Sequence, residues 1–107
     1  MINYSKSKIY FIKRRDTDEV IWTGGTISNI NRRYYNHISN KNDLLNKKVA
    51  RMNLNWSNLK IEVVKDYNTC RDRKTLRFAS ETVYCYYVRD NPEVFHYFLN
   101  NIDYFIE

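Results

Sequence analysis

The chain has 107 residues, enough for one domain but too few for two independent cores. It is 43% hydrophobic with ten Tyr, five Phe and two Trp, and its two Gly and one Pro exclude collagen-like and linker-like chains. No apolar run approaches the roughly 20 residues that cross a bilayer, and no basic start precedes a short apolar segment, so we expect neither a membrane protein nor a secreted precursor. We therefore expect a cytoplasmic domain without membrane contact. Its many Asn, Ile, Tyr and Lys residues have AT-rich codons, which favours a viral or phage gene and hence the host cytoplasm.

The basic residues are unevenly distributed along the chain. The 18 basic and 12 acidic residues give a net charge of +6; residues 1–60 carry twelve basic and four acidic side chains, and residues 61–107 carry six and eight. A basic half fits a surface that binds a polyanion, most often nucleic acid, but it also fits the solvated surface of an ordinary basic protein. Cys70 and Cys85 form no CxxC pair and have too few other ligands for zinc, so we expect free, buried thiols.

The first two predicted elements form a hairpin. Residues 8–14 (KIYFIKR) are β-branched and aromatic between charged ends, which predicts a strand. The polar residues 15–18 indicate a turn, and residues 19–23 (EVIWT) predict a second, antiparallel strand. Gly24 and Gly25 are the only glycines, and we expect them to end this strand where the backbone bends or packs closely.

Helices and a third strand follow. Ser28 fits the N-cap of a helix that runs to about residue 39, with Tyr34 and Ile38 on its apolar face. Asp43 fits the N-cap of a helix over 44–54. Residues 59–64 (LKIEVV) alternate like a strand, a longer helix is predicted over 69–88, and Pro92 suits the first turn of a last helix. The order ββααβαα predicts one α+β domain over residues 1–107, a small three-stranded antiparallel sheet flanked by helices.

Four polar side chains on three predicted elements are candidates for chemistry. Tyr10 lies on the first strand, Arg33 and His37 on the first helix, and Glu81 on the long helix. Arg33 and His37 are four residues apart and therefore share one helix face. Glu81 lies one turn after Arg77, so a surface ion pair is an alternative role for its carboxylate. Taken singly, each residue also fits a structural role.

The order of these residues along the chain resembles the GIY-YIG nuclease superfamily. The resemblance covers residues 8–88. It is carried, in chain order, by Lys8-Ile9-Tyr10, Trp22-Thr23-Gly24, Arg33-xxx-His37 and a helical Glu81. Lys8 stands where the first motif has Gly, Trp22-Thr23 stand where the second has Tyr-Ile, and Gly24 matches the Gly of the second motif. The Asn that many members carry after the Glu helix has no clear counterpart. Residues 92–107 form an additional C-terminal helix in this comparison.

The resemblance implies a site and a function. It implies that Tyr10 helps to activate the attacking water and that Arg33 binds the scissile phosphate. It also implies that His37 has an accessory catalytic role and that Glu81 binds the single divalent metal ion, Mg²⁺ or Mn²⁺. The implied protein is a divalent-metal-dependent endonuclease that hydrolyses phosphodiester bonds in DNA. Because the indole of Trp22 lacks a hydroxyl, the alternative is a degenerate scaffold that binds nucleic acid or inhibits a partner protein without cleaving, for example a viral anti-defence factor.

Further side chains are candidates for contacts with partners. A basic patch around the second predicted helix fits DNA phosphate contacts or a plain solvated face; its members are Lys41, Lys47, Lys48 and Arg51. Five tyrosines can stack on bases, although packing in the core is the favoured interpretation: Tyr34, Tyr35, Tyr84, Tyr86 and Tyr87. Without a separate specificity domain, selectivity would come from this fold, from a homodimer or from a protein partner.

Overall fold

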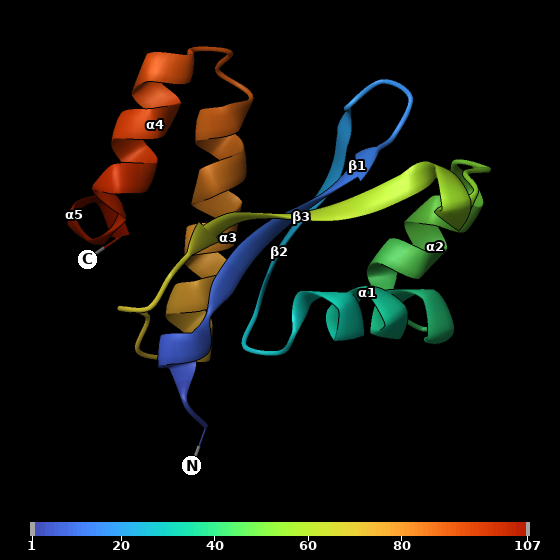
Figure 1. The fold of residues 1–107 in the computed structure, drawn as a ribbon, viewed down its shortest axis with the longest axis horizontal. Helices are drawn as coiled ribbons and strands as arrows, with labels where there is room; N and C mark the ends of the chain where they lie inside the picture. The colour runs from blue at the N-terminus through green and yellow to red at the C-terminus, as the bar shows by residue number, and fades with distance from the viewer. Residues whose placement is uncertain (1, 107) are drawn as a thin grey trace.

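A three-stranded antiparallel sheet lies between two groups of helices in the computed structural model, which describes residues 2–106 (Figure 1). The strands are β1 (Lys8–Arg14), β2 (Val20–Thr26) and β3 (Leu59–Asp66), in the spatial order β2-β1-β3. The helices are α1 (Ile30–Ser39), α2 (Leu44–Arg51), α3 (Arg73–Tyr87), α4 (Pro92–Asn100) and α5 (Ile102–Ile106), with short 3-10 turns at Tyr4–Lys6 and Trp56–Asn58. The predicted α+β class and the order ββααβαα are confirmed.

The central strand β1 is buried on both faces because helices cover the sheet on each side. Ile9 and Phe11 belong to a cluster with α3, α4 and α5, whereas Tyr10 and Ile12 belong to a cluster with α2 and the half-buried residues of α1. Consecutive side chains of a strand point to opposite faces, so β1 contributes to both clusters. The two cores are therefore not independent, as the length of the chain requires.

The strand β2 does not end at its two glycines. It continues to Thr26, and Gly24 and Gly25 pair with Tyr10 and Ile9 of β1. Neither glycine has a positive φ. Their role is close approach: a Cβ at Gly24 would collide with the Tyr10 phenol, and a Cβ at Gly25 would lie 2.6 Å from Cγ of Leu76 in α3. The expected close packing is present, and the expected end of the strand was wrong.

Helix α2 begins at its predicted cap but ends before its predicted last residue. The Asp43 side chain accepts from the backbone N–H of Asn46, as an N-cap does. At the other end, Asn53 takes the left-handed conformation (φ 55°), and the N–H of Leu54 donates to the carbonyl of Val49. This Schellman-type arrangement stops α2 at Arg51, three residues before the predicted end.

Three other predicted helix bounds differ from the structure. Helix α1 begins after Asn29 rather than Ser28, because the Asn29 side chain accepts from two backbone N–H groups. Helix α3 begins after its cap Asp72, not at Thr69, whose hydroxyl donates to Asp103 instead. The predicted last helix is two helices, because at Asn101 the backbone leaves the helical conformation (φ −124°, ψ 32°). No helix among residues 2–106 is long and apolar enough to cross a membrane.

The tyrosines and cysteines divide between core and surface. Tyr86 stacks on Phe98 with ring centroids 4.3 Å apart, and Tyr34 packs in the core while its hydroxyl donates to the Trp56 carbonyl. Tyr35 and Tyr84 are exposed, so the core interpretation holds for only part of the set. Both cysteines are free, but only Cys70 is buried; Cys85 of α3 is exposed, which corrects the expectation of two buried thiols.

The close approach of α3 to β2 predicts a steric cost at Gly25. Gly25→Ala places a methyl group against the Leu76 side chain, and overpacking of this kind costs about 1–3 kcal/mol. We expect urea denaturation to show this loss in the free energy of unfolding. In the double variant Gly25→Ala/Leu76→Ala the two effects should be less than additive, because the smaller side chain makes room for the methyl. Strict additivity would contradict the packing argument.

Candidate active site

The hydroxyl of Tyr10 is the centre of the candidate site. Tyr10 is almost fully buried in β1, and its ring lies over Gly24 of the neighbouring strand, where no side chain blocks it. Burial without a partner would be costly for a phenol. The structure satisfies the hydroxyl with His37, whose Nε2 lies 2.8 Å from it, and with Arg33, whose Nε donates to it at 3.4 Å.

His37 connects Tyr10 to a carboxylate. Its side chain is 1% exposed, and Nδ1 lies 2.7 Å from Oδ2 of Asp43. A carboxylate only accepts hydrogen bonds, so Nδ1 of His37 carries the proton and donates to Asp43. In the neutral imidazole Nε2 then accepts from the Tyr10 hydroxyl. The result is a buried chain Asp43–His37–Tyr10, in which the carboxylate fixes the tautomer of the imidazole as it does in other acid–base sites.

The surroundings keep both Tyr10 and His37 neutral. Burial lowers the pKa of His37, an effect that the hydrogen bond from His37 to Asp43 opposes and the charge of Arg33 reinforces. Burial raises the pKa of Tyr10, although hydrogen bonds from Arg33 and Trp22 and the charge of Arg33 partly offset it. A neutral imidazole beside a neutral phenol is the arrangement in which the imidazole can take the phenolic proton.

Glu81 reaches the same cavity as Tyr10 from the opposite side of the sheet. Helix α1 and helix α3 cover different faces (Figure 1), and the cavity, about 500 Å³ in volume, lies at the outer edge of β2 where both faces are accessible. Its lining comes from four parts of the chain: Tyr10; Trp22, Thr23, Gly24 and Gly25; Arg33, Asp43 and Leu44; and Arg73, Arg77, Ser80 and Glu81. Tyr10, Arg33 and Glu81 therefore share one concave surface, and His37 lies behind Tyr10.

The donor set fits a divalent cation held by one protein carboxylate. Glu81 is 64% exposed, and its one partner in the described residues is Arg77 at 3.5 Å, itself 83% exposed, a pair that is worth little. The hydroxyl of Thr23, also on this cavity, is buried without a hydrogen-bond partner among the described residues. Residues 2–106 contain no cluster of three His, Cys, Asp or Glu. Any Mg²⁺ here would therefore depend on waters and substrate oxygens for most of its ligands, which Mg²⁺ tolerates.

The predicted basic patch lies apart from this cavity. Lys41, Lys47 and Arg51 are exposed and do not line it. Lys48 is half-buried, and its ammonium donates to the carbonyl of Ile21 at 2.8 Å, which holds α2 against β2. Of the four, Lys48 thus has a structural contact, and the other three remain candidates for partner binding.

The sequence did not predict three charged residues of the cavity, Asp43, Arg73 and Arg77, as site residues. Asp43 was predicted only as a helix cap, because no helical spacing relates it to His37 and the turn between α1 and α2 brings the two together. Arg73 and Arg77 belong to the half of the chain with a net negative charge, and only the packing of α3 beside β2 brings them to the site.

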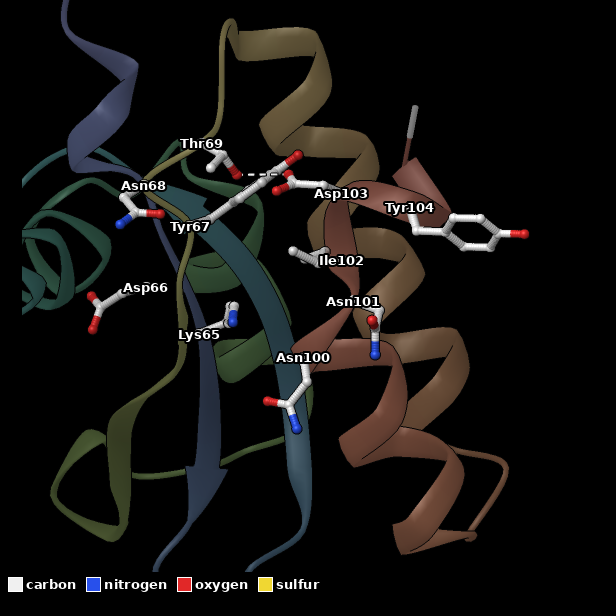
Figure 2. Close-up of a pocket in the computed structure, with 10 residues that line it drawn as sticks. All are labelled: Lys65, Asp66, Tyr67, Asn68, Thr69, Asn100, Asn101, Ile102, Asp103 and Tyr104. Carbon is white, nitrogen blue, oxygen red and sulfur yellow. Dashed lines mark hydrogen bonds between the residues drawn. The ribbon is translucent and has the colours of Figure 1, made fainter.

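A second polar cavity lies elsewhere on the molecule and contains none of the predicted site residues. Figure 2 shows it between the loop after β3 and the α4–α5 junction, with a volume of about 340 Å³. The hydroxyl of Thr69 donates to Asp103 across it at 2.6 Å. This contact joins the chain before α3 to α5, and we assign the cavity no function.

The lowered pKa of His37 predicts a loss of stability in mild acid. Because the folded protein binds this proton less readily than the unfolded chain, whose His pKa is near 6.5, the free energy of unfolding should fall as the pH drops from about 6.5 through the folded pKa. We expect His37→Gln to flatten this dependence in urea denaturation between pH 7.5 and 5.5. The exposed His96→Gln is the control and should keep the wild-type slope. Equal slopes in all three proteins would contradict the prediction.

Removing the charge of Asp43 should alter His37 without melting α2. Asn caps helices about as well as Asp, but it lacks the charge that favours the imidazolium. In Asp43→Asn the pKa of His37 should therefore fall further, which NMR titration of its ring signals would measure. Asp72→Asn makes the same change at the cap of α3, away from His37, and should leave this pKa in place. An unchanged His37 pKa in Asp43→Asn would refute the coupling.

Comparison of the chain with protein-family models, with curated proteins and with solved structures finds no match. The resemblance to GIY-YIG nucleases therefore rests on the motif residues and on their order along the chain. The function that it implies is a proposal, and it has to be argued from the geometry of Tyr10, His37, Arg33 and Glu81.

Proposed function

We propose that this protein is a divalent-metal-dependent endonuclease that hydrolyses phosphodiester bonds in DNA. The observation that carries the proposal is the convergence of Tyr10, Arg33 and Glu81 on one cavity, with His37 bonded to the Tyr10 hydroxyl. These residues come from β1, α1 and α3, far apart in the sequence. A purely structural role for Tyr10 and His37 explains their hydrogen bond, but it does not explain why a cation and an exposed carboxylate line the same cavity as that hydroxyl.

Arg33 and Tyr10 supply the phosphate contact and the proton acceptor. The Arg33 guanidinium has donors left besides the Nε–H that meets Tyr10, and a planar fork suits phosphate oxygens. As a water oxygen forms its bond to phosphorus, the water gives a proton to the Tyr10 oxygen, and the phenolic proton passes to Nε2 of His37. The opposite P–O bond breaks, and the leaving oxygen takes a proton from solvent. Asp43 stabilises the imidazolium that forms.

Glu81 is the residue that would hold Mg²⁺ or Mn²⁺. When bound, such an ion stabilises the negative charge that develops on the phosphate oxygens. Because the pairing of Glu81 with Arg77 is exposed, giving it up costs little. Arg77 would then be released to face the substrate.

The alternative, a scaffold that binds DNA or a protein without cleaving, is favoured by one observation. Trp22 occupies the second-motif position on β2 and lines the same cavity as Tyr10, so that position carries an indole and no hydroxyl. An indole N–H donates but cannot accept a proton. The two functions are separated by whether the purified protein cuts DNA.

Glu81→Gln tests the nuclease. Wild type should nick supercoiled plasmid with Mg²⁺ or Mn²⁺ but not with a chelator, and the variant should lose about 10²-fold or more of this rate, because a main electrostatic contributor is gone. The same substitution at Glu62, which lies on the opposite edge strand β3 and pairs with Lys13, is the matched control and should leave the rate unchanged. If wild type leaves the plasmid intact with either metal, the non-cleaving scaffold becomes the function.

A further inference from the structure

The outer edge of β2 is the floor of a groove longer than the site itself. Among the described strands, β2 pairs only with β1. The site cavity shares Gly25, Arg33 and Arg73 with a neighbouring cavity of about 280 Å³ that extends toward Tyr4. In the other direction it shares Trp22, Thr23 and Glu81 with a cavity of about 360 Å³ that extends toward Tyr84. We call these three connected cavities the β2 groove.

The groove carries three guanidinium groups but little uncompensated negative charge. Arg33, Arg73 and Arg77 line it. Of its two carboxylates, Asp43 is bonded to His37 and Glu81 is paired with Arg77. The Arg73 side chain is exposed, and its guanidinium makes no hydrogen bond or ion pair with any residue in 2–106. An unpaired guanidinium on a concave surface is available for an anionic ligand.

The spacing of the two arginines on α3 matches a repeating anion. Residues four apart on a helix lie on one face with about 5–6 Å between their Cβ atoms, close to the separation of neighbouring phosphates on one strand. Arg33 lines the same two cavities as Arg73. The aromatic side chains of Trp22 and Tyr84 line the far end of the groove. Aromatic rings stack on bases, which favours DNA over an acidic peptide as the ligand.

We propose that the β2 groove holds the backbone of one DNA strand, with Arg73 and Arg77 binding the phosphates next to the one at Arg33 and Tyr10. This proposal rests on the proposed function for its choice of DNA. It assigns the main phosphate contacts to α3 rather than to the basic patch around α2. It also gives Arg77 two states, paired with Glu81 without DNA and bound to phosphate with it.

The test compares charge-matched variants in DNA binding. Arg73→Gln and Arg71→Gln remove the same charge two residues apart, but Arg71 does not line the groove. Fluorescence anisotropy with a labelled DNA oligonucleotide, in chelator so that nothing is cut, measures affinity against salt. We expect Arg73→Gln to weaken binding about tenfold. Its slope of log affinity against log salt should flatten by about 0.7–0.9, one phosphate contact, and Arg71→Gln should change both far less. Denaturant unfolding confirms that both variants fold.

Three outcomes would overturn the groove. One is equal binding by Arg73→Gln and Arg71→Gln, and a second is a loss that appears only in Lys47→Gln, which would place the DNA on the α2 patch. The third is polyglutamate binding as tightly as DNA at the same salt. Because binding is measured without cleavage, the two proposals can fail separately. If the wild type binds DNA through Arg73 but never cuts it, the nuclease function is rejected and the DNA-binding groove is retained.

Discussion

The buried hydroxyl of Tyr10 is the constraint on which the rest of the site depends. A phenol placed in the central strand of a sheet needs a hydrogen-bond partner, because its desolvation is otherwise uncompensated. His37 satisfies the hydroxyl, Asp43 satisfies His37, and Gly24 leaves room for the ring. The buried Tyr10 hydroxyl thus needs His37, the buried imidazole of His37 needs Asp43, and the Tyr10 ring needs a residue without a side chain at position 24. The hydrogen bonds that compensate the burial of the Tyr10 hydroxyl also place the His37 imidazole, in one fixed tautomer, and the Arg33 guanidinium beside its oxygen.

Local signals predicted the elements, and tertiary packing decided what the sequence left open. The hairpin, the Asp43 cap and the order of elements follow from patterns within a few residues of each other. The continuation of β2 through Gly24 depends on pairing with β1. Ile38, predicted on the apolar face of α1, is 37% exposed, whereas His37 is buried, because a polar residue with two partners is accepted in the core. The distribution of charge along the sequence does not reveal Arg73 as a site residue, because only the packing of α3 beside β2 brings it to the cavity.

The site is assembled from two layers that a sheet normally keeps apart. Arg33 belongs to the layer of α1 and α2, and Glu81 to the layer of α3. They share a cavity only at the edge strand, where two consecutive residues without side chains let α3 approach β2 and the Tyr10 ring lie over it. The glycine pair thus contributes no chemistry of its own. It determines that groups from both faces of the sheet meet at one place.

Asp43 has two partners, and they lie on different helices. Its Oδ2 accepts from the imidazole of His37 in α1 and from the backbone N–H of Asn46 at the start of α2. Any event that draws the carboxylate toward an imidazolium weakens its hold on that N–H. Protonation of the His37 ring should therefore weaken the hydrogen bond between Asp43 and the Asn46 N–H in the first turn of α2. Hydrogen exchange at the Asn46 amide would report the charge state of the buried imidazole from the surface of the molecule.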